Sequence, residues 1–236
     1  FSKDASLVAY SISEAGEDWR KVVVMNTKTK ELVGDTINNV KFSAISWKSN
    51  EGFYYSSYEA PEGSKLSSKT DQHILYFHTL GTKQKFDKVI FGAIPSEKNR
   101  YVRGYVTDDS RFLIIDAAVK TTGNKLFIKD LKNNSTLKRI VDNYDSNTYI
   151  LDNNGSDLIL VTDHNAPNKR IVKTNFSNPE QNNWVDLISE QEFVLSPSTC
   201  GGYIFTEYMI DAISRVYQYN YDGELIREIN LPGIGS

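Results

Sequence analysis

The sequence has few residues of the kinds that form covalent or metal cross-links. A single cysteine, Cys200, among 236 residues excludes an internal disulfide and any zinc site built on cysteines. Of the three histidines, His73 and His78 lie five positions apart in one expected strand, so they point to opposite faces and cannot share a metal there. We expect both to serve in packing or hydrogen bonding, with no metal site and no cofactor.

The sequence also lacks an excess of one charge and any long apolar run. Lysine and arginine (27) nearly balance aspartate and glutamate (30), without a basic cluster, so no nucleic-acid partner is expected. No apolar run approaches the roughly 18 residues needed to span a bilayer, so no membrane partner is expected either. The chain begins at Phe1, without an initiator methionine or a signal-like segment, which suggests a fragment or an excised domain. Low cysteine usage fits the cytoplasm and the periplasm equally.

Catalytic signatures are missing as well. The G-x-S-x-G motif of serine hydrolases does not occur, and the serine-glycine stretch at 196–202 lacks its spacing. Cys200 has no histidine near it in sequence and is expected to be a small packed residue. The carboxylates Asp108, Asp109 and Asp152 are expected in turns that precede strands, without the alternating pattern of calcium loops. We therefore expect no catalytic residue in this chain.

What the sequence does contain is a succession of short aromatic and β-branched segments. Apolar residues with helical spacing never extend beyond about two turns. The stretch 70–82 has an apolar, aromatic centre between turn-forming ends, which predicts a well-buried strand. With segments 41–47, 50–56 and 89–92, it predicts one four-stranded antiparallel sheet, the unit of a β-propeller.

This unit recurs along the chain. Its second strand begins with an apolar residue at intervals of 46, 59, 46 and 45 positions, and the long interval contains a polar insert at 59–65. A period of about 40–50 residues with four strands per period is typical of propeller blades. The five starting residues are Leu7, Phe53, Phe112, Leu158 and Tyr203. We divide a single propeller domain, 1–236, into approximate repeats 1–40, 41–98, 99–146, 147–191 and 192–236.

Five repeats fit either a complete five-bladed ring or part of a larger one. The first repeat begins at its second strand, and the chain stops just after 231–233, which favours a piece of a larger ring. Such a piece has two uncovered blade faces, so we expect self-association through them unless the ring closes.

Several segments resemble the propeller domain of the prolyl oligopeptidases, also called prolyl endopeptidases. The dense run from Phe42 to Thr82 is specific, because a generic propeller has no reason to contain its motif His-x-Leu-Tyr-Phe-His-x-Leu-Gly-Thr. The resemblance runs nearly end to end. The segments that carry it are 13–20, 40–43 with Trp47, 52–58, 70–82 and 165–170.

The resemblance implies a function. The family joins an α/β-hydrolase domain, which carries a Ser-Asp-His triad, to a seven-bladed propeller that caps the active site and admits only short peptides for cleavage after proline. This chain resembles about five blades of that propeller, and no triad residue can be assigned to it. We therefore expect a non-catalytic gating domain. Its expected partners are the hydrolase domain of the same protein and short proline-containing peptides.

Two positions match family site residues, and two more lie near the place of another. Phe42 matches an aromatic residue that faces the substrate cavity, and Asp18 matches an acidic residue that faces the hydrolase domain. Tyr101 and Val102 lie about where the family places another cavity-lining apolar residue. The residue types alone also fit a blade-core aromatic at Phe42 and a surface charge at Asp18.

Two other functions are alternatives to the gating domain. A free-standing propeller scaffold for protein interactions is the main alternative, but the WD and G-H signatures of that class are missing. A five-bladed carbohydrate-active enzyme requires two acidic residues that face each other across a central pocket. The sequence places no such pair.

Overall fold

The structure, a computed structural model, describes residues 1–14, 16–59 and 70–233. The polar insert predicted at 59–65 therefore lies, beyond Glu59, outside the described residues. The described chain is almost entirely strand and turn, with short 3-10 segments at η2 (Gln84–Phe86), η3 (Pro95–Glu97) and η4 (Gln181–Asn183). Within these residues, no helix is long and apolar enough to cross a membrane. The predicted all-β class is confirmed.

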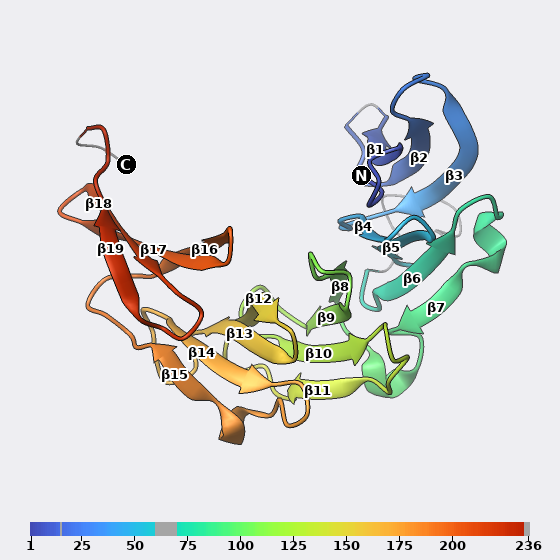
Figure 1. Cartoon of the computed structure of the whole chain (residues 1–236). Helices are drawn as coiled ribbons and strands as arrows, with labels where there is room; N and C mark the ends of the chain where they lie inside the picture. The colour runs from blue at the N-terminus through green and yellow to red at the C-terminus, as the bar shows by residue number, and fades with distance from the viewer. Residues whose placement is uncertain (15, 60–69, 234–236) are drawn as a thin grey trace. The chain divides into compact units, whose positions relative to one another are not determined.

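The strands form antiparallel sheets in which sequence neighbours pair, as Figure 1 shows. Over the described residues the first sheet has three strands and the next four sheets have four each. The first sheet contains β1 (Leu7–Ser13), β2 (Arg20–Asn26) and β3 (Leu32–Val40). The second contains β4 (Ser46–Lys48), β5 (Gly52–Ser57), β6 (Ile74–Thr79) and β7 (Lys88–Phe91). The third contains β8 (Tyr101–Val106), β9 (Phe112–Ala118), β10 (Lys125–Asp130) and β11 (Lys138–Val141). The fourth contains β12 (Thr148–Asn154), β13 (Asp157–Thr162), β14 (Arg170–Asn175) and β15 (Val185–Ile188). The fifth contains β16 (Ser196–Cys200), β17 (Tyr203–Ile210), β18 (Ile213–Tyr219) and β19 (Leu225–Ile229).

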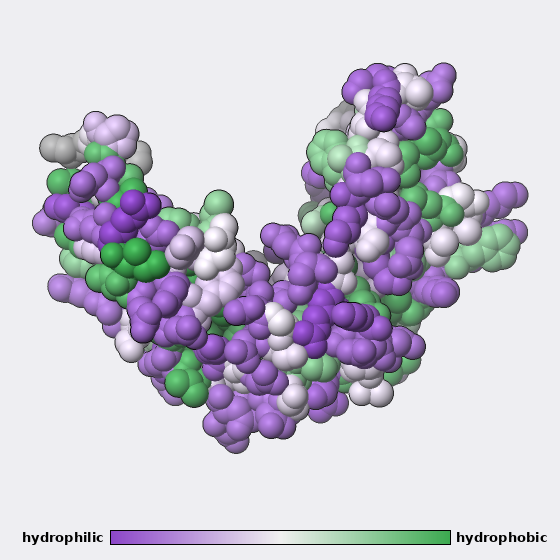
Figure 2. Space-filling model, in the orientation of Figure 1, coloured by the Kyte–Doolittle hydropathy of each residue, from purple (hydrophilic) through white to green (hydrophobic). Residues whose placement is uncertain are grey.

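Burial differs with the position of a strand in its sheet. The second strands β5 and β13 are buried along nearly their whole length, which explains their continuous apolar and aromatic sequence. The closing strand β19 is mostly exposed, and its residues Leu225 and Ile226 face solvent. On the face drawn in Figure 2, polar side chains cover most of the surface and apolar ones lie in separate patches.

The chain divides into two compact units. Unit 1 comprises residues 1–121 and 127–137, and unit 2 comprises 122–126 and 138–236. In unit 1 the first two sheets share one apolar core, and the second and third sheets share another. Their fully buried members include Val22, Ile37 and Phe53 in the first core and Leu75, Val102 and Ile115 in the second. Unit 2 has its own core around Ile159, Ile171 and Ile204.

Three local expectations were wrong. The predicted strand at 41–47 is reduced to β4, because Phe42 adopts a left-handed backbone conformation (φ 53°) that ends extended structure. Asp152 lies inside β12, where the register with β13 shifts at a bulge, rather than in a turn before a strand. Cys200 is exposed at the end of β16, not packed. Asp109 does lie in a turn, where its carboxylate accepts hydrogen bonds from the Thr107 hydroxyl and the Arg111 amide.

Candidate functional site

One pocket in unit 1 brings together predicted site residues from distant parts of the sequence. Its volume is about 410 Å³. Three of the four predicted site residues, Asp18, Phe42 and Tyr101, line it. Its full lining consists of Asp18, Arg20, Phe42, Ser43, Ala44, Tyr101 and Arg103.

The lining residues come from several elements of unit 1. Asp18 lies in the connection between β1 and β2, and Phe42 lies in the connection between β3 and β4. Tyr101 and Arg103 both belong to β8, two positions apart. Side chains two apart on a strand project to the same face, so the strand geometry places the phenol and the guanidinium on one side.

The backbone that carries Phe42 is held by a buried histidine. The Nε2–H of His73 donates to the Lys41 carbonyl at 2.9 Å, while its Nδ1 accepts from the Val102 amide at 3.0 Å. These two bonds require the neutral tautomer with its proton on Nε2. Burial, with a smaller contribution from the positive charge of Arg103, lowers the pKa of His73 to about 4. His73 therefore stays neutral at physiological pH and fixes the segment that precedes Phe42.

Phe42 stands at the centre of an aromatic wall. Its ring lies 6.3 Å from the ring of Tyr58 in an edge-to-face arrangement and 6.2 Å from the ring of Tyr101. Tyr58 in turn stacks on His73 at 4.4 Å and donates its hydroxyl hydrogen to the Arg100 carbonyl. Although it makes these contacts, Phe42 remains 49% exposed. A half-exposed aromatic ring held by rigid neighbours is suited to contact an apolar ligand group.

Charged groups surround this wall. The Lys41 ammonium lies 3.5 Å from the Asp18 carboxylate and 5.1 Å from the centre of the Phe42 ring. Arg103 is paired in register with Asp116 of β9. Burial raises the pKa of Asp116 to about 6, and the charge of Arg103 partly opposes that rise.

Val102, the fourth predicted residue, does not line this pocket. Its side chain is fully buried and packs in the core with Leu75 and Leu113. The reason is the alternation of a strand: consecutive residues face opposite sides, so Tyr101 and Val102 cannot both face one pocket. Counting two positions on from Tyr101 along the strand would have predicted Arg103 as a lining residue. The sequence analysis did not name it.

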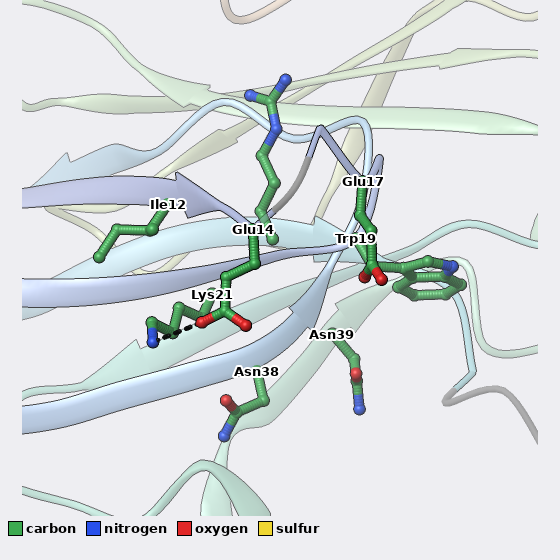
Figure 3. A pocket seen from close by; sticks show the side chains of 8 residues that line it. Ile12, Glu14, Glu17, Trp19, Lys21, Asn38 and Asn39 are labelled. Atoms are coloured by element: carbon green, nitrogen blue, oxygen red, sulfur yellow. Dashed lines mark hydrogen bonds and ion pairs between the residues drawn. The ribbon is translucent and has the colours of Figure 1, made fainter.

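A second pocket in unit 1 is smaller, and the acidic and basic side chains in its lining are equal in number (Figure 3). It has a volume of about 100 Å³ and lies beside the connection between β1 and β2. Glu14 and Lys21 at its rim form an ion pair at 2.8 Å. Among the described residues, no group of three or more histidines, cysteines or carboxylates could hold a metal ion. The pocket around Phe42 is therefore the stronger candidate site.

The fold and this pocket define an all-β propeller domain with an aromatic, charged recess. The family model described as "Prolyl oligopeptidase, N-terminal beta-propeller domain" matches residues 1–236. The chain belongs to this family, which confirms the resemblance and the propeller fold predicted from the sequence.

Curated relatives and solved structures agree. The chain is 50% identical to the prolyl endopeptidase of Elizabethkingia meningoseptica and 48% identical to that of Elizabethkingia miricola, over its full length and 34% of each relative. It therefore spans about a third of these relatives. A structure from a study of two prolyl endopeptidases superposes with a TM-score of 0.90 at 27% identity, covering 100% of this chain and 34% of that one. A substrate-bound prolyl oligopeptidase B of Galerina marginata matches with a TM-score of 0.87 at 21% identity, over 100% of this chain and 35% of that one, which supports the fold alone.

Proposed function

We propose that this chain is the non-catalytic gating propeller of a post-proline serine peptidase. In this proposal an α/β-hydrolase domain of the same protein supplies the Ser-Asp-His triad, and the propeller restricts access to short peptides. The pocket around Phe42 forms part of the wall of the substrate cavity, and Asp18 faces the hydrolase domain.

The conformation of Phe42 is the observation that carries this proposal. A bulky residue with positive φ costs on the order of 1–3 kcal/mol and persists only where its surroundings enforce it. Here the neighbouring carbonyl is held by His73, yet the ring that results is half exposed. An aromatic ring placed at such a cost without being buried contributes little to stability. Contact with a ligand is the simpler reason for its position.

The chemistry of the wall suits the proposed substrates. Aromatic faces contact apolar side chains and proline rings favourably while excluding water. Rigid aromatic contacts also position a peptide without chemistry of their own. A short proline-containing peptide therefore suits this surface.

The test is Phe42→Ala in the full-length peptidase that carries this propeller. Loss of the ring should lower kcat/KM for a short proline-containing peptide roughly five- to tenfold, since burying about half a phenylalanine contributes about 1–1.5 kcal/mol. Phe86→Ala is the matched control, because Phe86 is also an exposed phenylalanine but lies on η2 and is not among the residues that line the pocket. Equal activity of both variants would refute the cavity-wall role and favour the scaffold alternative.

A further inference from the structure

The lining of the Phe42 pocket contains two arginines, Arg20 and Arg103. Both arginines are exposed. Among the described residues, neither guanidinium lies within ion-pair distance of a carboxylate, in contrast to Arg111, Arg139 and Arg170.

The lining of this pocket contains one carboxylate against these two guanidinium groups. Asp18, the only acidic residue in the lining, lies beside the Lys41 ammonium. Asp116 is opposite Arg103 in the β8–β9 register and is half-buried. The charge of Arg103 favours its ionised form, but the described residues include no ion pair between the two side chains. The lining itself therefore carries two positive charges and one negative charge beside its aromatic wall.

We propose that Arg20 and Arg103 form a subsite for a carboxylate, and that this subsite gives the peptidase a preference for peptides with an acidic side chain near the proline. The inference rests on the proposed function and specifies the class of peptide. Arginine binds a carboxylate through two parallel N–H···O bonds, which gives direction as well as affinity. The aromatic wall holds the apolar part of the same peptide while the guanidinium groups bind the carboxylate.

The test compares matched short peptides in the full-length peptidase. Glutamate is placed in turn at each position next to the proline, and each peptide has a glutamine counterpart of the same shape. At one position the glutamate peptide should have a kcat/KM about three- to tenfold higher than its counterpart at low salt, and this ratio should fall at 0.5 M salt.

Variants of the two arginines show which residues cause this preference. Arg103→Gln and Arg20→Gln should each bring the glutamate-to-glutamine ratio closer to one, and Arg103→Lys should keep part of it. Arg139→Gln removes the same charge from an exposed residue of β11 that is paired with Asp142, and it should leave the ratio unchanged. The two arginines are tested separately. If one variant misfolds, the glutamate-to-glutamine ratio of the other variant still tests the subsite.

The outcomes separate this inference from the proposed function. If no position shows a preference, or if both arginine variants keep it, the carboxylate subsite is wrong. If the arginine variants have no effect while Phe42→Ala still weakens cleavage of the glutamine peptide, only the subsite fails. If Phe42→Ala also leaves that peptide unaffected, the cavity-wall role fails.

Discussion

At the residue scale, His73 is the side chain on which the Phe42 pocket depends. It satisfies one carbonyl and one amide that belong to segments far apart in sequence, at Lys41 and Val102. His73→Ala leaves both backbone groups without this partner and opens a space beneath Tyr58. We expect the free energy of unfolding to fall by about 2–4 kcal/mol, measured by urea denaturation. His164→Ala, in a polar turn, is the control and should change it by less than about 0.5 kcal/mol.

The same histidine gives stability a pH dependence. Its folded pKa of about 4 lies below the usual 6.5, so between these values the unfolded chain binds a proton that the folded chain does not. The contribution of His73 is therefore complete above pH 6.5 and is lost as the pH falls toward 4. His73→Gln should reduce the loss of stability between pH 7 and pH 5. An unchanged slope would contradict the lowered pKa of His73.

Asp116 should give the free energy of unfolding the opposite dependence on pH. Its folded pKa of about 6 lies above the usual 3.8, so its ionisation opposes folding as the pH rises from about 4 to about 6. Asp116→Asn should be more stable than the parent chain at pH 7.5 by roughly 1–2 kcal/mol, allowing for solvent screening. This advantage should shrink as the pH falls toward 4. A difference that stays constant with pH would contradict the raised pKa.

The resemblance to a known family located part of the candidate site. Phe42, Asp18 and Tyr101 were found because their flanking segments resemble a known family, and the structure brings them to one pocket. If Tyr101 lines the pocket, strand alternation predicts that Arg103 lines it too. This prediction requires that the start of β8 is known. Arg20 has no signal in the sequence, because its place in the pocket depends on how the first sheet packs beside the second.

At the element scale, the close approach of neighbouring sheets depends on a glycine. A Cβ added at Gly104 on β8 would lie 2.6 Å from the Cδ2 atom of Leu75 on β6, which is fully buried. Gly104→Ala should therefore cost about 1–3 kcal/mol of unfolding free energy through overpacking. Leu75→Ala should cost about 2–5 kcal/mol through the cavity it leaves.

A double-mutant cycle tests whether this contact is the cause. In the Leu75→Ala background the space is open, so adding Gly104→Ala should cost less than about 0.5 kcal/mol or be favourable. Additive costs would mean that Gly104 is required for its backbone conformation rather than for the contact.

Element positions were more predictable than element ends. Strands β5, β9, β13 and β17 begin near residues that the period identified, because buried strands need continuous apolar sequence. The segment before β4 was misread as strand because residues 41–47 include several apolar residues. The left-handed backbone at Phe42 has no signal in the sequence, and the carbonyl before it is held by His73, which is distant in sequence. At the bulge in β12, the carboxylate of Asp152 accepts a hydrogen bond from the hydroxyl of Tyr221, which is also distant in sequence.

At the scale of the whole molecule, the chain accounts for about a third of its relatives. The five repeats, the association with a hydrolase domain and the self-association of exposed blade faces stay predictions. The sequence period located the sheets, since each sheet is built from consecutive strands. The two compact units of the structure have no signal in that period, because a boundary within the third sheet depends on packing between elements.

The gating role is tested most directly by the cleavage of a short fluorogenic Gly-Pro peptide and of a proline-containing peptide of about 40 residues. Each is tested with this chain alone, with a separately produced hydrolase domain alone, and with the two together. The gating role predicts no turnover by the chain alone, and a marked fall in cleavage of the long peptide relative to the short one when the chain is added to the hydrolase domain. Turnover by the chain alone, or size selectivity that is the same with and without it, would contradict the account.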